Sequence, residues 1–178
     1  MVLKLIREVF KVGEATLPYP FKPVEVAPGF RGRPQHHPEL CMACAACTVA
    51  CPSNALAMEN DLENGVRTWS LFYGRCIYCA RCEEVCPTGA ITLTQDFELA
   101  VFRRQDLLVQ ADYTLAACRI CGVFFAPAKE LEYTWALLEQ AGLLGEDPDQ
   151  RRAVLETCPQ CKRKAAVPHI VNLYQEAV

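Results

Sequence analysis

Hydrophobic positions at the start of the chain recur with the spacing of an amphipathic helix. In residues 2–12, Val2, Ile6 and Val9 fall on one helical stripe, and the charged residues fall largely elsewhere. The pattern therefore predicts a helix over this segment. Such a helix either packs on its own domain or lies on a membrane interface or a partner protein, and the pattern favours both equally.

The helix is followed by a segment that cannot be helical. Six prolines occur between residues 18 and 38, and proline fixes φ and lacks an amide hydrogen. The segment is therefore expected to be extended. An extended arm that runs over another surface suits a subunit of a larger assembly, and a solvated linker is the alternative.

Strand patterns flank the middle of the chain. Residues 55–60 and 66–72 are two strand-like runs around the turn sequence DLENG, which predicts a β-hairpin. Residues 90–94 and 97–102 are also strand-like. Each half of this region reads as a cysteine motif, a short helix and a strand, which indicates an internal duplication.

The pattern changes from Asp106 onward. A helix is predicted over residues 129–141, and a second one begins with Asp147 as N-cap and Pro148 at the first helical position and ends near Glu156. Residues 168–178 suggest a short closing helix. The predicted fold class is α+β, with a helix and docking arm (1–37), a central domain that contains the duplicated halves (38–105) and a C-terminal four-cysteine segment (106–178).

Length and composition fit one ordinary domain with attachments, since the chain has 178 residues and is 52% hydrophobic. We expect neither a signal peptide nor a transmembrane helix, because no long run of apolar residues occurs. Residues 1–37 hold six Lys/Arg against three Asp/Glu, whereas residues 38–178 hold twelve against eighteen. The basic arm lacks a dense cationic cluster, so no nucleic-acid partner is expected.

Eight of the twelve cysteines fall into two runs, CMACAACTVACP at 41–52 and CIYCARCEEVCP at 76–87. Both read C-x2-C-x2-C-x3-C-P, the spacing of two-cluster ferredoxins, in which the fourth cysteine of each run ligates the other cluster. Disulfides and a zinc site are the alternatives for these eight cysteines. Because both spacings and both prolines match the cluster pattern, clusters are favoured over either alternative. The runs predict two 4Fe-4S clusters, the first held by Cys41, Cys44, Cys47 and Cys86, and the second by Cys76, Cys79, Cys82 and Cys51. Residues 38–105 are therefore predicted to form a two-cluster ferredoxin-like domain.

The two predicted cluster sites differ in the charges between their cysteines. The second run carries Arg81, Glu83 and Glu84 and is directly preceded by Arg75, whereas the first run is uncharged. We therefore expect the two reduction potentials to differ. Because a nearby cation favours the more negative reduced state, Arg81→Ala is expected to lower the potential of the second cluster.

The remaining cysteines form two CxxC pairs. Two such pairs can supply four thiolates to one tetrahedral metal. The 36 residues between the pairs exceed the usual zinc-ribbon gap of about 15–20, and two short helices would account for the excess. Zinc is the first choice of metal and a rubredoxin-like mononuclear iron the second, while a redox-active CxxC disulfide is a minor alternative. The predicted ligands are Cys118, Cys121, Cys158 and Cys161.

The chain resembles one family over nearly its whole length. The resemblance is carried by the amphipathic start, the proline-rich arm and the motifs CAACTVACPSNA, CIYCARCEEVCPTGAI, FELAVF, CRIC and CPQCKR. The chain is similar to the ferredoxin-type subunit of formate hydrogenlyase, and over residues 1–100 to the two-cluster ferredoxin subunit of respiratory complex I. Family members often carry glycine before the second cysteine, where this chain has Ala43.

The resemblance implies an electron-transfer subunit, not a catalyst by itself, in a formate hydrogenlyase or related group 4 nickel-iron hydrogenase complex. It implies partners in the hydrogenase large and small subunits, another ferredoxin-like subunit and membrane subunits. It further implies a peripheral position on the cytoplasmic side of the inner membrane, with residues 2–12 in contact with the membrane. A free soluble two-cluster ferredoxin is the main alternative, and an iron–sulfur regulatory protein is a more distant one.

Overall fold

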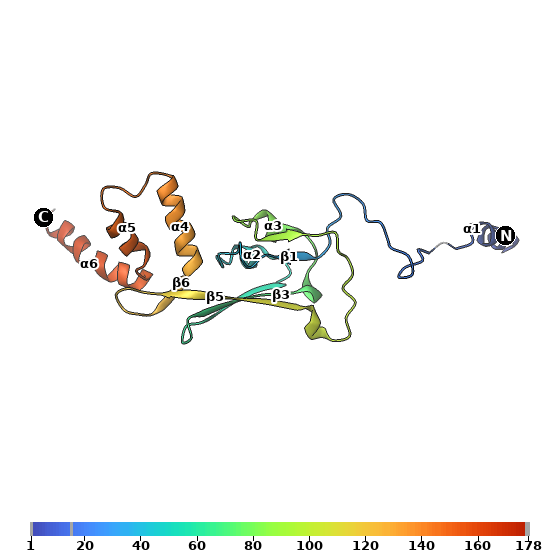
Figure 1. Ribbon diagram of the computed structural model, residues 1–178, viewed down its shortest axis with the longest axis horizontal. Helices are drawn as coiled ribbons and strands as arrows, with labels where there is room; N and C mark the ends of the chain where they lie inside the picture. Colours follow the sequence, from blue (N-terminus) through green and yellow to red (C-terminus); the bar gives the residue numbers. More distant parts are fainter. Residues whose placement is uncertain (1, 15, 177–178) are drawn as a thin grey trace. The chain divides into compact units, whose positions relative to one another are not determined.

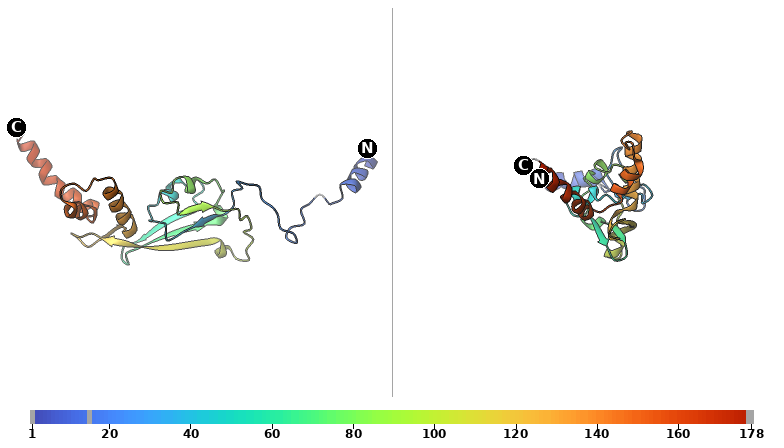
Figure 2. Two further views of the ribbon diagram at one scale, coloured as in Figure 1. Left: turned by 45° about the horizontal axis from the view of Figure 1, so that its top comes forward. Right: turned by 90° about the vertical axis from the view of Figure 1, so that its left-hand side faces the viewer.

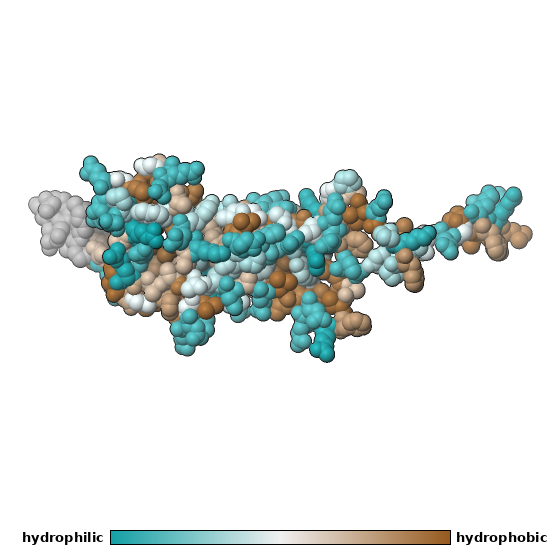
Figure 3. All heavy atoms as spheres, in the orientation of Figure 1, coloured by the Kyte–Doolittle hydropathy of each residue, from teal (hydrophilic) through white to brown (hydrophobic). Residues whose placement is uncertain are grey.

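The computed structural model describes residues 2–14 and 16–176, and divides into two units, Met1–Phe30 and Arg31–Val178. The first unit contains helix α1 (Val2–Val12) and an extended segment. Gly13, at φ +62°, ends the helix by donating its amide hydrogen to the Val9 carbonyl at 3.1 Å. Apolar side chains of α1 gather on one side of the helix and charged ones on the other (Figure 3), and Phe10 is 84% exposed.

An antiparallel sheet organises the second unit. Its strands are β2 (Leu56–Asp61), β3 (Val66–Phe72), β5 (Leu108–Ala117) and β6 (Phe124–Pro127), in the order β2-β3-β5-β6 (Figure 1). The hairpin predicted from the sequence is confirmed, with Leu56 opposite Leu71. Its turn is stabilised by Asp61, whose carboxylate accepts hydrogen bonds from the Glu63 and Asn64 amides at 3.1 and 3.0 Å.

Strand β5 was not anticipated from the sequence. It begins just after the predicted domain boundary at residue 105 and pairs with β3 over seven residues, from Leu108↔Phe72 to Thr114↔Val66. The third and fourth strands of the sheet therefore come from the C-terminal segment. That segment shares its sheet with the ferredoxin half instead of forming a separate body.

A second, two-stranded antiparallel sheet pairs β1 (Pro34–His36) with β4 (Ile91–Leu93). Residues 34–36, which the sequence assigned to the docking arm, thus belong to the ferredoxin unit. The pairing continues through the Gly32 amide, which donates to the Thr94 carbonyl at 2.7 Å. The strand predicted over residues 97–102 is wrong, because this segment is irregular and has no strand partner among the described residues.

Short helices follow the cysteine loops, and longer ones cover the C-terminal segment. These are α2 (Ala46–Ala50), η1 (Tyr73–Arg75), α3 (Arg81–Glu84), η2 (Arg104–Leu107), α4 (Ala128–Gln140), α5 (Pro148–Leu155) and α6 (Pro159–Glu176). The two predicted helices near 129–141 and 148–156 are confirmed, and Asp147 caps α5 by accepting from the Gln150 amide at 3.0 Å. Helix α6 starts earlier than predicted.

The hydrophobic core lies between one face of the sheet and the cysteine loops, with α2, α3 and the β1–β4 pair on that face (Figures 1 and 2). Trp69 and Leu71 of β3 are each 1% exposed. Ile91 of β4 and Tyr113 of β5 complete the core from outside the hairpin. Within the described part of the chain, no helix is long and apolar enough to cross a membrane.

Candidate iron–sulfur and metal sites

Two cavities beneath the cysteine loops collect the eight cysteines of the two runs. The first cavity is lined by Cys41, Cys44, Cys47 and Cys86, and the second by Cys76, Cys79, Cys82 and Cys51. Each cavity takes three cysteines from one run and the fourth from the other run. These are the same two sets that the ligation rule groups from the sequence.

Backbone geometry accounts for the tight wrapping of both loops. Ala43 and Ala45 flank Cys44 at φ 59° and 63°, and Tyr78 and Ala80 flank Cys79 at φ 55° and 67°. A left-handed conformation is unusual for residues with a Cβ atom, and its repetition at matching positions shows that both loops have one backbone design. The glycine that is common before the second cysteine in the resembling family suits this φ, and Ala43 adopts it nonetheless.

Backbone amides point at the sulfur atoms of these loops. The Ala43 amide donates to Cys41 Sγ at 3.4 Å, the Ala55 amide to Cys51 Sγ at 3.3 Å, and the Ala90 amide to Cys86 Sγ at 3.2 Å. Amide donors stabilise sulfur in its anionic form. Four sulfur donors, an otherwise largely apolar lining and converging amides fit a 4Fe-4S cluster in each cavity, because a cluster needs thiolate ligands and hydrogen bonds to its sulfurs.

The thiol pKa values follow burial and hydrogen bonding. Burial raises the pKa of Cys82 to about 12 and also raises that of Cys47 and Cys76. For Cys51 and Cys86 burial acts in the same direction but is outweighed by hydrogen bonds, so the pKa of each is lowered. The buried thiols would carry protons in the absence of a cation, which is the expected state of ligands that ionise when a metal binds.

Three aromatic side chains beside the first cavity were given no role from the sequence. The His36 ring stacks on Trp69 with centroids 3.8 Å apart, and His36 Nε2 lies 3.2 Å from the Tyr113 hydroxyl. Burial, and then the charge of His37, lowers the pKa of His36 to about 4. Tyr113 could have been found by its alternation with Ala111 and Leu115, the period of a half-buried strand.

Two of the charged residues beside the second cavity, Arg81 and Glu84, form an ion pair on the surface. Arg81 Nη1 lies 2.5 Å from Glu84 Oε2, and Glu83 Oε1 accepts a hydrogen bond from the Leu93 amide at 3.2 Å. The carboxylate of Glu84 offsets much of the positive charge of Arg81. The expected effect of Arg81→Ala on the second cluster is therefore smaller than the sequence alone suggests.

The four late cysteines converge at a separate place in the second unit. The Sγ atoms of Cys118, Cys121, Cys158 and Cys161 all lie within 4.8 Å of one another. Cys121 Sγ and Cys158 Sγ are 3.7 Å apart, close to the edge of about 3.8 Å expected for a tetrahedron with metal–sulfur bonds of about 2.3 Å. The geometry therefore fits one tetrahedral metal ion.

Secondary structure between the two CxxC pairs explains their long separation. Strand β6 and helices α4 and α5 fill the gap, and the Arg119 amide donates to the Glu156 carbonyl at 3.1 Å, which ties the two knuckles together. The Cys158 amide donates to Cys118 Sγ at 3.2 Å. This hydrogen bond is the main reason that the pKa of Cys118 falls to about 6.

Parts of the chain are similar to known proteins. A family model described as a 4Fe-4S dicluster domain matches residues 40–90. The chain is 44% identical over 59 residues to NADH-quinone oxidoreductase subunit 9 of Thermus thermophilus, covering 29% of this chain and 32% of that protein. The membrane-bound sulfane sulfur reductase, an archaeal respiratory membrane complex, contains a chain with 27% identity and a TM-score of 0.42 over 57% of this chain and 58% of that one.

One similarity extends over nearly the whole chain. Formate hydrogenlyase subunit 6 of Escherichia coli (strain K12) is 48% identical over 164 residues, which cover 92% of this chain and 90% of that protein. The aligned length is much greater than that of the dicluster domain and cannot be confined to it. The chain therefore belongs to the formate hydrogenlyase subunit 6 family.

Proposed function

We propose that this chain relays electrons through two 4Fe-4S clusters as a peripheral subunit of a membrane-associated formate hydrogenlyase or related nickel-iron hydrogenase complex. The observation that carries the proposal is the pair of cavities, each lined by three cysteines of one run and one of the other, in a member of the formate hydrogenlyase subunit 6 family. When bound, the clusters supply one-electron carriers. The protein's part is to hold them close together and keep water away.

The ligand sets that we propose follow the lining of the cavities. The first cluster is held by Cys41, Cys44, Cys47 and Cys86, and the second by Cys76, Cys79, Cys82 and Cys51. Because Cys51 comes directly after α2 and Cys86 two residues after the end of α3, each short helix connects one cavity to the other. The exchange joins the two halves of the domain and supports transfer between neighbouring clusters.

The four-cysteine group of the C-terminal segment is proposed as a structural zinc site, with a mononuclear iron as the alternative. Two of its sulfur ligands, those of Cys118 and Cys158, are buried, and all four positions of a tetrahedron are supplied by the protein. A closed site of this kind supports a structural role. It would hold the α5–α6 region against the loop after β5.

Helix α1 is proposed as the contact with the membrane or its subunits, on the cytoplasmic side. Its apolar side chains Leu3, Leu5 and Phe10 are 82%, 70% and 84% exposed. Lys4, Arg7 and Lys11 on the same helix suit an anionic lipid surface. The proposed protein partners are the hydrogenase large and small subunits, a further ferredoxin-like subunit and the membrane subunits.

The proposal is tested by purifying the full chain without oxygen from its native host in mild detergent. We expect about eight iron, eight sulfide and one zinc per chain, with hydrogenase subunits attached. Cys118→Ser should remove the zinc and leave the iron and sulfide unchanged, whereas Cys44→Ser should lower the iron and leave the zinc. A chain that contains both clusters but is isolated as a lone monomer would contradict the subunit role.

The contact made by α1 has its own test. Phe10→Glu should release the complex from anionic phospholipid vesicles in a flotation assay while its subunits stay together. Val49→Glu, which changes an equally exposed apolar residue outside α1, is the matched control and should leave flotation unchanged. Full retention of the Phe10→Glu complex on the vesicles would contradict the lipid contact.

A further inference from the structure

We propose that Arg67 of β3 is a positioning residue for the first iron–sulfur site, and that its charge raises the reduction potential of the cluster there. The inference rests on the proposed function, because it requires a cluster in the first cavity. Arg67 is not a ligand and lies outside both cysteine runs. Its role is to hold the loop of the first run from the sheet and to place a cation beside that loop.

The inward face of β3 carries side chains to both cavities. Successive residues of a strand point to opposite faces, so Arg67, Trp69 and Leu71 lie on the same face. Trp69 lines the first cavity and Leu71 lines the second. Arg67 continues this row beyond Trp69 and therefore stands beside the loop of the first run, on the side away from the second cavity.

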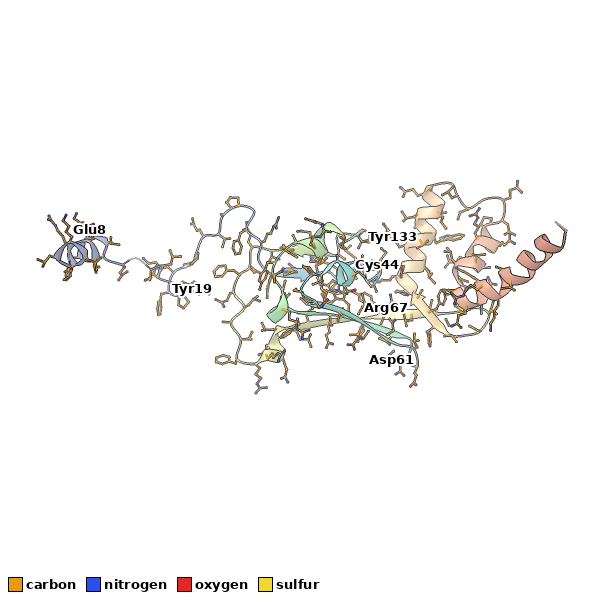
Figure 4. All side chains as sticks on the ribbon, turned by 180° about the vertical axis from the view of Figure 1, so that it is seen from behind. Glu8, Tyr19, Cys44, Asp61, Arg67 and Tyr133 are labelled. Atoms are coloured by element: carbon orange, nitrogen blue, oxygen red, sulfur yellow. The ribbon has the colours of Figure 1, made fainter. Side chains whose placement is uncertain are left out.

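The Arg67 guanidinium bonds directly to the wall of the first cavity. Its Nη1 donates to the carbonyl oxygen of Ala43 at 2.8 Å, and Ala43 lines that cavity (Figure 4, where Arg67 and the neighbouring Cys44 are labelled). Its Nε donates to Asn60 Oδ1 at 2.7 Å, and Asn60 lies directly opposite Arg67 on β2. Because two nitrogens of one planar group are held, Arg67 is a fixed donor to the loop.

The Ala43 carbonyl depends on this donor. Ala43 is 1% exposed, and within the described residues no second donor reaches its carbonyl oxygen. A buried acceptor without a partner is costly, and so is the left-handed φ of 59° at a residue with a Cβ atom. The amide of Ala43 donates to Cys41 Sγ at 3.4 Å. The bond from Arg67 therefore stabilises the conformation that directs this amide at a proposed cluster ligand.

The second loop has no counterpart of this donor. Tyr78 holds the matching position at φ 55°, and in the described part of the chain its carbonyl accepts no side-chain hydrogen bond. Arg81, within the second run, is paired with Glu84. Arg75, which precedes that run, is exposed, so water and salt screen its charge. The contact from β3 thus distinguishes the first cavity from the second.

The charge of Arg67 is only partly offset. Glu130 of α4 is the opposing carboxylate, since the charge of Arg67 acts on it against the burial that raises its pKa. No ion pair joins the two side chains in the described structure. Arg67 is also partly buried, which weakens screening by water. A reduced cluster carries one more negative charge, so this cation favours reduction of the first cluster.

The charge is tested by an EPR-monitored redox titration of the holoprotein and its variants, in which Cys44→Ser identifies the signal of the first cluster. Arg67→Gln removes the charge, so the first midpoint should shift to a more negative potential while the second is unchanged. Arg67→Lys keeps the charge and should restore most of that shift, which a purely structural role would not produce. Arg104→Gln is the matched control, because it removes an exposed cation that lies over the Phe72 ring, outside the lining of both cavities, and it should leave the first midpoint unchanged.

The positioning role is tested by exposing the holoprotein to air, reducing it again and measuring the EPR signal that remains. The single nitrogen of lysine cannot hold both Asn60 and Ala43 as the guanidinium does. Arg67→Lys should therefore lose the first signal about tenfold faster than the unmodified protein, with no change for the second. Asn60→Ala changes an exposed side chain, so the protein should fold, and it should also speed loss of the first signal because it frees the guanidinium.

The outcomes separate the two proposals. In a protein with about eight iron and eight sulfide, a first midpoint that Arg67→Gln leaves unmoved, or equal shifts of both midpoints, would overturn the charge role. Loss of the first signal at the unmodified rate in both Arg67→Lys and Asn60→Ala would overturn the positioning role, even if Arg67→Gln fails to assemble its clusters. Each of these results leaves the proposed function standing. A chain that binds no cluster in its unmodified form would overturn the proposed function, and this inference with it.

Discussion

Replacing Gly32 with alanine is expected to loosen the edge of the second cavity. Gly32 is buried where the chain enters β1, and a Cβ atom at this position would lie 2.2 Å from the carbonyl oxygen of Asp96. The obstructing atoms are backbone, which cannot turn aside as a flexible side chain could. The segments around residues 32 and 96 must therefore separate.

The magnitude follows from the hydrogen bonds that this separation breaks. The Gly32 amide donates to Thr94 at 2.7 Å, the Arg33 amide to Asp96 at 2.7 Å, and the Thr94 amide to Arg33 at 3.1 Å. Each such bond is worth about 0.5–1.5 kcal/mol net, so losing all three destabilises the folded state by about 1.5–4.5 kcal/mol. Because Pro34 and Leu93 of the adjoining strands line the second cavity, water and oxygen should then reach the second cluster.

The assay follows the visible iron–sulfur absorbance after transfer of the anaerobic protein into urea. Since about 1.4 kcal/mol corresponds to a factor of ten, we expect Gly32→Ala to lose absorbance about tenfold faster or more. Gly29→Ala is the control, because an added Cβ atom there meets nothing within 4 Å, although φ +81° adds strain of its own. A Gly32→Ala rate within about twofold of the unmodified protein would refute the steric argument, since that is less than about 0.5 kcal/mol.

Three other changes have defined outcomes. Leu71→Ala should lower the free energy of unfolding by about 2–5 kcal/mol in urea titrations, because this core side chain is 1% exposed. Ala43→Val should destabilise the protein by about 1–3 kcal/mol or more and lower its iron content, because it forces a β-branched residue to φ 59° in a buried loop. The control, Ala57→Val at an exposed strand position, should leave stability and iron content unchanged. The pKa of His36 is about 4 in the folded protein and 6.5 ordinarily, so between these pH values the unfolded chain binds one more proton than the folded protein. The free energy of unfolding should therefore fall as the pH drops from about 6.5 to about 4. His36→Gln should flatten that part of a plot of unfolding free energy against pH.

Predictions from local patterns agreed with the structure where one signal dominated. The 55–72 hairpin follows from its turn and its strand-like flanks, and α5 follows from Asp147 and Pro148 at its start. Residues 97–102 show the opposite case. They are rich in apolar residues but form no strand, because a strand requires a partner that composition does not specify.

By itself, the sequence determined the kind of cofactor and the grouping of cysteines that we propose as its ligands. Both depend on spacings of a few residues and on one exchange between two similar runs, so they can be inferred without knowing the rest of the fold. Only the tertiary structure decided that β5 joins the hairpin, and with it that Tyr113 lies within hydrogen-bonding distance of His36 and Lys129 within hydrogen-bonding distance of the Pro38 carbonyl. Those contacts join residues far apart in the chain, and their formation depends on packing between segments that no local pattern encodes.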